Sequence, residues 1–103
     1  MTYGVMGGHY QPVGHTHFLT NVIDYGMDEQ EALDCARGFH FGGQYALEDG
    51  VPPATVRGLA DLGHNVVRAA FPHGGGQAIR IDWRNGTLAA GSEPRKDGCA
   101  IGY

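Results

Sequence analysis

The chain has 103 residues, which is enough for one domain with a modest hydrophobic core. Apolar residues make up 42% of the chain and charged residues 17%, a composition that suits a globular protein and excludes intrinsic disorder. The net charge is −4 and no basic run occurs, so no nucleic acid partner is expected. No apolar stretch approaches the roughly 20 residues of a membrane span, so no membrane partner is expected either.

Glycine is enriched, with 18 of 103 residues against a usual share of about 7%. The glycines fall between segments of regular pattern, which predicts many short elements joined by tight turns. The two cysteines, Cys35 and Cys99, lie far apart without CxxC spacing, so we expect two free thiols. Residues 1–12 have no signal-peptide pattern, and the cellular location cannot be read from this sequence.

Two helices are predicted in the first third of the chain. Between residues 16 and 25 the apolar side chains follow one helical stripe, and Gly26 is the predicted end. Asp28 followed by Glu31 has the spacing of a capping box, which predicts a second helix over residues 28–36. Its predicted inward-facing residues are Ala32, Leu33, Cys35 and Ala36.

The middle of the chain predicts a strand, a helix and a second strand. Between residues 37 and 50 four large apolar residues fall at odd positions, which predicts a strand interrupted at Gly42–Gly43. Residues 51–63 have two prolines in a first turn and a closing glycine, which predicts a helix, and a strand over 64–70 follows. The odd-position residues are Phe39, Phe41, Tyr45 and Leu47, and the predicted buried face of the helix is Val56, Leu59 and Ala60.

The last third predicts a β-hairpin, because Asn85-Gly86 separates an alternating stretch over residues 77–83 from a return strand over 87–90. The preceding Gly74–Gly76 lacks the Lys-Ser/Thr of a phosphate-binding loop and precedes a strand, so a turn is predicted there. The tail from residue 92 is turn-rich. No internal repeat or linker divides residues 1–103, and the order of elements predicts one α+β or layered α/β domain.

The stretch GVMGGHYQPVGH, residues 4–15, contains two adjacent glycines. Adjacent glycines cost backbone entropy, which implies that a side chain would obstruct something there. Gly7 and Gly8 either form an ordinary loop, which the residues alone favour, or present two bare N–H groups to one oxygen, as in an oxyanion hole. A helix that begins near Gly14 would add its dipole to such a site if its N-terminus pointed the same way.

Three histidines lie in or beside this stretch: His9, His15 and His17. On a strand, His-x-His would aim both rings to one side, as zinc sites sometimes do. Cysteine or carboxylate partners at ligand spacing are missing, and on the helix predicted from Thr16 the two rings would diverge. The sequence therefore favours no metal site, and a histidine metal site remains an alternative.

Four segments, in this order, resemble the closing stretch of γ-glutamyltranspeptidases: MGGHYQPVGH, NVIDYGMDEQEALDCAR, GGGQAI and GSEPRKDGCAIGY. The resemblance covers essentially all 103 residues, and its specificity lies in the combined order. The form GxMGGxxQPxGH is similar to the branch that includes oxamate amidohydrolase-like members. The resemblance implies part of an N-terminal-nucleophile hydrolase, an αββα sandwich with helices packed on antiparallel strands, and no cofactor.

The resemblance also implies a site. In the family a precursor cleaves itself, the exposed threonine attacks a γ-glutamyl amide, and the acyl group passes to water or to an amino acceptor. Gly7 and Gly8 match the glycine pair whose backbone N–H groups bind the oxyanion, and His9 and Gln11 are the candidate substrate-binding residues. His9 replaces a serine of glutathione-specific members. The nucleophilic threonine would lie upstream of Met1, so this chain alone is expected to be inactive.

Two accounts follow from the resemblance. In the first, the chain is the C-terminal part of a small subunit, with the large subunit and the rest of the small subunit as partners and a γ-glutamyl or small amide substrate. In the second, it is a non-catalytic remnant or a small binding module that keeps the fold. A half-sandwich leaves apolar strand faces and edges bare, which favours a homo-oligomer.

Overall fold

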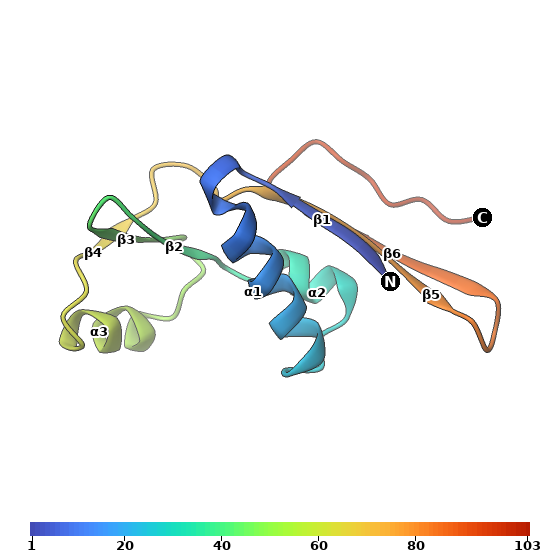
Figure 1. The fold of residues 1–103 in the computed structure, drawn as a ribbon, viewed down its shortest axis with the longest axis horizontal. Helices are drawn as coiled ribbons and strands as arrows, with labels where there is room; N and C mark the ends of the chain where they lie inside the picture. The colour runs from blue at the N-terminus through green and yellow to red at the C-terminus, as the bar shows by residue number, and fades with distance from the viewer. The chain divides into compact units, whose positions relative to one another are not determined.

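The computed structural model describes residues 1–103. The chain forms two compact units: Met1–Asp34 with Gly74–Tyr103, and Cys35–His73. The first unit combines helices with a three-stranded sheet, and the second combines one helix with a three-stranded sheet (Figure 1), which confirms the predicted α+β class. No helix is long and apolar enough to cross a membrane.

The sheet of the first unit has the strand order β1-β5-β6, with β1 at Thr2–Met6, β5 at Gly75–Asp82 and β6 at Thr87–Ser92. Both neighbouring pairs are antiparallel. Strand β1 was not predicted, although Tyr3 and Val5 alternate with smaller or exposed residues in the way a half-buried strand requires. Figure 1 shows α1 and α2 on one face of this sheet and the C-terminal tail on the other.

Helix α1 extends over Gln11–Ile23 and follows the short 3-10 helix η1 at Gly8–Tyr10. It therefore begins several residues before the predicted start near Gly14. Pro12 lies in its first turn, where the fixed φ of proline suits a helix and its missing N–H is not needed. Helix α1 ends at Ile23, and Gly26 follows with a φ of +69°.

Helix α2 extends over Glu29–Asp34, and its predicted capping box is confirmed. The Asp28 N–H donates to Glu31 Oε2 at 3.1 Å, and the Glu31 N–H donates to Asp28 Oδ1 at 2.8 Å. The helix stops before Cys35 and Ala36, so their predicted helical placement is wrong. The next residue, Arg37, does not continue the helical ladder: its carbonyl accepts from the Glu48 N–H, and its N–H donates to the Glu48 side chain at Oε2, both at 2.9 Å.

The core of the first unit lies between the sheet and the two helices. The Tyr3 and Phe18 rings lie 4.8 Å apart across the β1–α1 interface. At Gly91 on β6, an added Cβ would lie 3.0 Å from the Glu29 backbone and from Leu33 Cδ1, so α2 packs against bare backbone. The buried apolar residues of this unit are Val5, Tyr10, Phe18, Ala32, Leu33 and Ala78, which confirms the inward placement of Ala32 and Leu33.

The β5–β6 hairpin is confirmed, with a four-residue loop between the paired residues Asp82 and Thr87. Asp82 Oδ1 accepts from the Arg84 N–H at 2.9 Å and from the Asn85 N–H at 3.1 Å, which orders the loop. The predicted Gly74–Gly76 turn is confirmed only at Gly74, which has a φ of +67°. The next two glycines already pair with β1 in the ladder, so they belong to β5.

The second unit contains β2 at Gly38–Phe41, β3 at Gln44–Leu47, α3 at Pro53–Asp61 and β4 at Val66–Arg68, with the strand order β2-β3-β4. The β2–β3 pair is antiparallel and the β3–β4 pair is parallel. The break at Gly42–Gly43 is confirmed as a two-residue turn with positive φ at both glycines. Because Phe41 pairs with Gln44, the odd-position residues change face across the turn: Phe39 and Phe41 share one face, and Tyr45 and Leu47 share the other.

Helix α3 ends as predicted. The Gly63 N–H donates to the Ala60 carbonyl at 2.9 Å and the His64 N–H donates to the Leu59 carbonyl at 3.1 Å, which is a Schellman cap with φ +94° at Gly63. The predicted buried face is wrong in part: Val56 and Leu59 are half-buried and Ala60 is exposed, because within its unit α3 packs mainly beside the short β4. The following strand is shorter than predicted because His64 belongs to the cap.

Candidate functional site

The predicted site lies in the connection between β1 and α1. Met6 is the last residue of the strand, and Gly7 and Gly8 lead into η1 and then α1. Gly7 has a φ of 141° and Gly8 a φ of 57°, which are conformations that L side chains rarely adopt. The Tyr10 N–H donates to the Gly7 carbonyl at 3.0 Å and closes the turn. Both glycines are therefore required by the backbone path itself.

The amides of the glycine pair are not used by the sheet. The β1–β5 ladder ends with the pair Met6 and Gly75, and neither the Gly7 nor the Gly8 N–H donates a hydrogen bond in the turns, loops and caps of the chain. Gly8 has a positive φ, and Tyr10 and Gln11, which follow at the end of η1, are in the right-handed helical region. Both glycines are exposed.

The two glycines differ in the space around them. A Cβ on Gly7 would lie 3.1 Å from Gly74 Cα and 3.2 Å from Tyr10 Cβ, so this position is closed by packed neighbours. A Cβ on Gly8 would meet no atom within 4 Å. Tyr10 is buried and packs against the turn at Gly7, whereas the space that a Gly8 side chain would occupy is open. This supporting role of Tyr10 was not predicted, although an aromatic residue two positions after a Gly-Gly pair was the available signal.

The other two predicted site residues lie beside the glycines. His9 is an exposed residue of η1, and Gln11 is the exposed first residue of α1. All four predicted site residues therefore lie on one exposed turn at the N-terminus of α1, where the positive end of the helix dipole favours an anion. The roles of His9 and Gln11 stay predictions.

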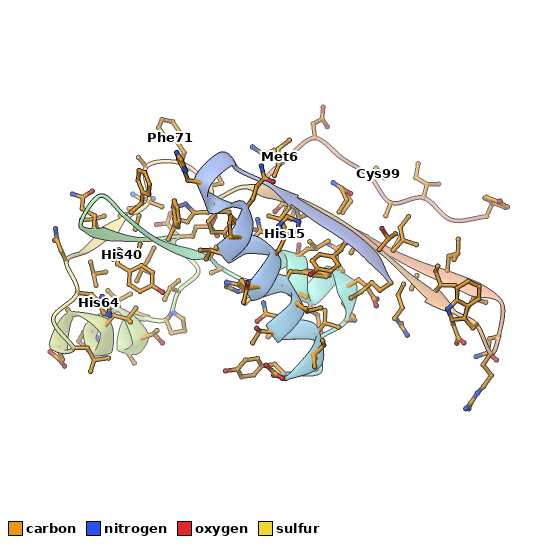
Figure 2. The ribbon with its side chains drawn as sticks, in the orientation of Figure 1. Met6, His15, His40, His64, Phe71 and Cys99 are labelled. Carbon is orange, nitrogen blue, oxygen red and sulfur yellow. The ribbon has the colours of Figure 1, made fainter.

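His15 connects α1 to β1 through both of its ring nitrogens. The Val5 N–H donates to His15 Nε2 at 3.2 Å, so His15 Nδ1 carries the proton and donates to the Gln11 carbonyl at 2.7 Å. Figure 2 labels His15 on α1, and Met6 at the turn. Since both nitrogens of His15 are engaged, the His-x-His alternative has lost a ligand. No group of three or more His, Cys, Asp or Glu side chains could hold a metal ion.

The C-terminal segment is held to the same unit by a buried ion pair. Arg95 Nη1 donates to Glu93 Oε2 at 3.1 Å and to the Leu33 carbonyl at 2.8 Å. Glu93 is fully buried and the Arg95 side chain is 10% exposed. The pair therefore fixes the start of the tail, just after β6, against the end of α2.

The family model described as gamma-glutamyltranspeptidase matches residues 1–103, the whole chain. The chain belongs to the γ-glutamyltranspeptidase family. The resemblance of the four sequence segments to this family is thereby confirmed.

Two curated γ-glutamyltranspeptidase relatives and one solved structure illustrate the similarity. The glutathione hydrolase-like YwrD proenzyme of Bacillus subtilis is 37% identical over 109 residues, which cover 97% of this chain and 21% of that protein. The oxamate amidohydrolase proenzyme of Klebsiella pneumoniae is 36% identical over 111 residues, which cover 100% of this chain and 21% of that protein. The crystal structure of cephalosporin acylase from Bacillus halodurans superposes with a TM-score of 0.88 at 37% identity, covering 98% of this chain and 20% of that one.

These γ-glutamyltranspeptidase relatives are much longer than this chain. The chain spans about a fifth of the length of the curated relatives it matches. The shared fold of helices on antiparallel strands is therefore one part of the structure that these relatives form.

Proposed function

We propose that residues 1–103 are a partial domain, the C-terminal part of the small subunit of a γ-glutamyltransferase-like or amidohydrolase-like enzyme, and that Gly7 and Gly8 supply its oxyanion hole. The observation that supports this role is the turn itself: two exposed glycines, with N–H groups outside the strand ladder, open space above Gly8 and a helix N-terminus next to them. Family membership of the whole chain supports the enzyme class.

The proposed chemistry is acyl transfer. A threonine nucleophile, contributed by polypeptide outside this chain, attacks the amide carbonyl of the substrate. The carbonyl oxygen becomes negative in the tetrahedral intermediate, and the Gly7 and Gly8 N–H groups donate to it where the negative charge develops. Collapse of the intermediate expels the amine, and water or an amino acceptor then takes the acyl group from the threonine.

The proposed substrate is a γ-glutamyl compound or another small amide. The names of the relatives support this range, since one is a glutathione hydrolase-like protein and one an oxamate amidohydrolase. His9 and Gln11 follow the glycine pair closely and are exposed, so we assign them to substrate contacts. Neither position is needed for the backbone donors to act.

The proposed partner is the remainder of the enzyme, that is, the large subunit and the other part of the small subunit. One face of the β1-β5-β6 sheet is turned away from the helices and exposes Ile79 and Leu88. Exposed apolar sheet surface of this kind is typical of an interface. The edge strands β1 and β6 of this antiparallel sheet also have no neighbouring strand on their outer sides within the chain.

The test is an activity comparison between the isolated chain and a chimera in which residues 1–103 replace the matching fifth of the Bacillus subtilis relative. We expect no turnover of a γ-glutamyl anilide or of oxamate by the pure chain, and turnover of at least one of them by the chimera. Turnover by the pure chain would contradict the placement of the nucleophile in other polypeptide.

A non-catalytic oligomerising module is the second candidate. The observation that favours it is a hollow of about 510 Å³ between the β5–β6 hairpin and the C-terminal tail, on the exposed sheet face. Apolar residues there, including Leu88 and Ile101, would be covered if two copies met through this face. Sedimentation of the isolated chain measures this association directly.

A further inference from the structure

The loop between β5 and β6 contains the dipeptide Asn85-Gly86, in which a side-chain amide precedes a residue without a side chain. The backbone nitrogen of the residue after an asparagine can attack the asparagine Cγ, and glycine hinders this attack least because it has no Cβ. Asn85 is exposed, and a Cβ on Gly86 would meet no atom within 4 Å. Packing around the loop therefore leaves the dipeptide accessible to water.

Asp82 holds both of the groups that would react. The Gly86 N–H, which belongs to the nucleophile, donates to the Asp82 backbone carbonyl at 2.8 Å. Asn85 Nδ2, the group that would leave, donates to Asp82 Oδ2 at 2.7 Å, and the Asn85 N–H donates to Asp82 Oδ1 at 3.1 Å. These bonds must open before reaction, because the Gly86 nitrogen has to lose its proton and the Asn85 amide nitrogen has to depart.

The charge of Asp82 opposes the same reaction. Attack builds negative charge on the Gly86 nitrogen and then on Asn85 Oδ1, beside a carboxylate that is already negative. Hydrogen bonds from the side chain and then the backbone of Asn85 hold the pKa of the Asp82 carboxyl below its ordinary value of 3.8, so this group is ionised at neutral pH. A like charge at this separation disfavours the newly charged form.

We propose that Asn85 is a latent self-modification site, which reacts with Gly86 to give aspartate and isoaspartate, and that Asp82 holds it in the unreacted amide form. The Gly86 nitrogen gives its proton to a base in solution and bonds to Asn85 Cγ, which closes a succinimide ring. The Cγ–Nδ2 bond breaks, and Nδ2 takes a proton from water and leaves as ammonia. Water then opens the ring at either of its carbonyls.

The product changes the loop that made the contacts. A carboxylate replaces the Asn85 amide donor and faces Asp82, and isoaspartate also adds a backbone carbon to a four-residue loop. This inference is independent of the proposed function, because the loop and the glycine turn lie at opposite ends of β5.

The first test compares the reaction rate in the folded and the unfolded chain. The chain is incubated at mildly alkaline pH with and without urea, and the tryptic peptide 85–95 is followed for a mass gain of one dalton, since Asn85 is its only amide side chain. We expect the folded chain to react at least about tenfold more slowly, because only its open loop can react. Equal rates, or no mass gain in urea, overturn the proposal.

The second test removes the Asp82 carboxylate. We expect Asp82→Ala to react about tenfold faster than wild type in buffer without urea, since the side-chain contacts of Asn85 and the opposing charge are lost. Asp97→Ala removes an exposed carboxylate of the tail and is the matched control, with an unchanged rate. Circular dichroism shows that each variant is folded. A folded Asp82→Ala chain that reacts no faster than wild type overturns the role of Asp82.

Asp82→Asn decides the proposal if Asp82→Ala does not fold. It keeps a side-chain oxygen for the N–H groups of Arg84 and Asn85 but has no charge. We expect its rate to lie between those of wild type and the chain in urea, and a rate equal to that of wild type overturns the assigned effect of the charge. The modified chain, separated by anion exchange, should melt at a lower temperature than the unmodified chain. An equal or higher melting temperature contradicts the Asn85–Asp82 contact.

Discussion

The backbone N–H of Tyr10 donates to the carbonyl of Gly7 at 3.0 Å, and the Tyr10 side chain lies where a Cβ on Gly7 would need space. Tyr10 thus closes the turn from inside the protein. The N–H groups of Gly7 and Gly8 take no part in this closure, which leaves them for an acceptor outside the chain. The turn therefore has a packed side at Gly7 and an open side at Gly8.

This asymmetry predicts different costs for the two glycine-to-alanine substitutions. Gly7→Ala adds a Cβ against Gly74 and Tyr10 and strains a φ of 141°, so we expect a loss of about 3 kcal/mol in the free energy of unfolding. Gly8→Ala adds only backbone strain, about 1 kcal/mol. Urea unfolding of the isolated chain measures both values. Equal losses would show that Tyr10 and Gly74 do not pack against Gly7 as described.

The buried ion pair of Glu93 and Arg95 predicts that substitutions of the two residues have strongly non-additive effects on the free energy of unfolding. Removing one partner leaves an uncompensated charge in the interior, so Glu93→Ala and Arg95→Ala should each cost about 3–5 kcal/mol. The double variant should cost clearly less than the two single losses added together, because neither charge then remains. Additive losses, measured by the same unfolding assay, would contradict a direct interaction between the two side chains.

The sequence predicted the local elements well where a capping or turn signal was present. The Asp28–Glu31 capping box, the glycine at the end of α3 and the Asn85-Gly86 hairpin all depend on contacts within a few residues. The turn at Gly7 and Gly8 was also predictable, because adjacent glycines set their backbone conformation locally, while their oxyanion role came only from the family resemblance and stays a prediction.

Long-range pairing was harder to predict from the sequence. Strand β1 is stabilised by β5, which is distant along the chain, so its five residues show only a weak alternation of their own. Which side chains of α3 are buried depends on the segments that pack against the helix. Those segments lie outside residues 51–63, so the pattern of these residues alone does not identify the buried face. The support of Gly7 by Tyr10 likewise depends on the position of Gly74 across the sheet.

The exposed ion pair of Asp49 and Arg68 predicts a pH-dependent contribution to stability. Arg68 Nε donates to Asp49 Oδ1 at 2.6 Å, and hydrogen bonding to Arg68 lowers the pKa of the Asp49 carboxyl below its ordinary value of 3.8. The folded state therefore favours the ionised carboxylate. Its contribution is complete above the ordinary pKa and is lost as the pH falls through the lowered folded pKa.

The measurement compares wild type with Asp49→Asn by thermal unfolding between pH 7 and pH 2. We expect the stability difference to be constant near neutral pH and to shrink below about pH 4, where the carboxylate becomes protonated first in the unfolded state, until it is lost below the lowered folded pKa. Added salt should reduce the difference, because both side chains are largely exposed. A difference that grows on acidification would contradict the direction assigned to the Asp49 pKa.

The exposed sheet face predicts self-association of the isolated chain. Leu88 is 69% exposed on that face, and we expect Leu88→Lys to lower the association measured by sedimentation velocity. Leu62→Lys, at a position 79% exposed beside the end of α3, is the matched control and should leave association unchanged. A wild-type chain that stays monomeric at all concentrations would argue against both the oligomer and the exposed apolar face as an interface.

The account depends most on the glycine amides, and one comparison in the active chimera tests them. Gly8 and Gly86 have similar φ values, 57° and 65°, and a Cβ meets no atom within 4 Å at either, so alanine imposes matched backbone strain. We predict that Gly8→Ala lowers kcat, by up to the roughly 10²–10³-fold that loss of one oxyanion donor costs, because the added Cβ enters the open space where the substrate oxygen would lie and the strained φ turns the N–H away from it, while Gly86→Ala leaves kcat nearly unchanged. Equal kcat values for the two variants would contradict an oxyanion hole at this turn.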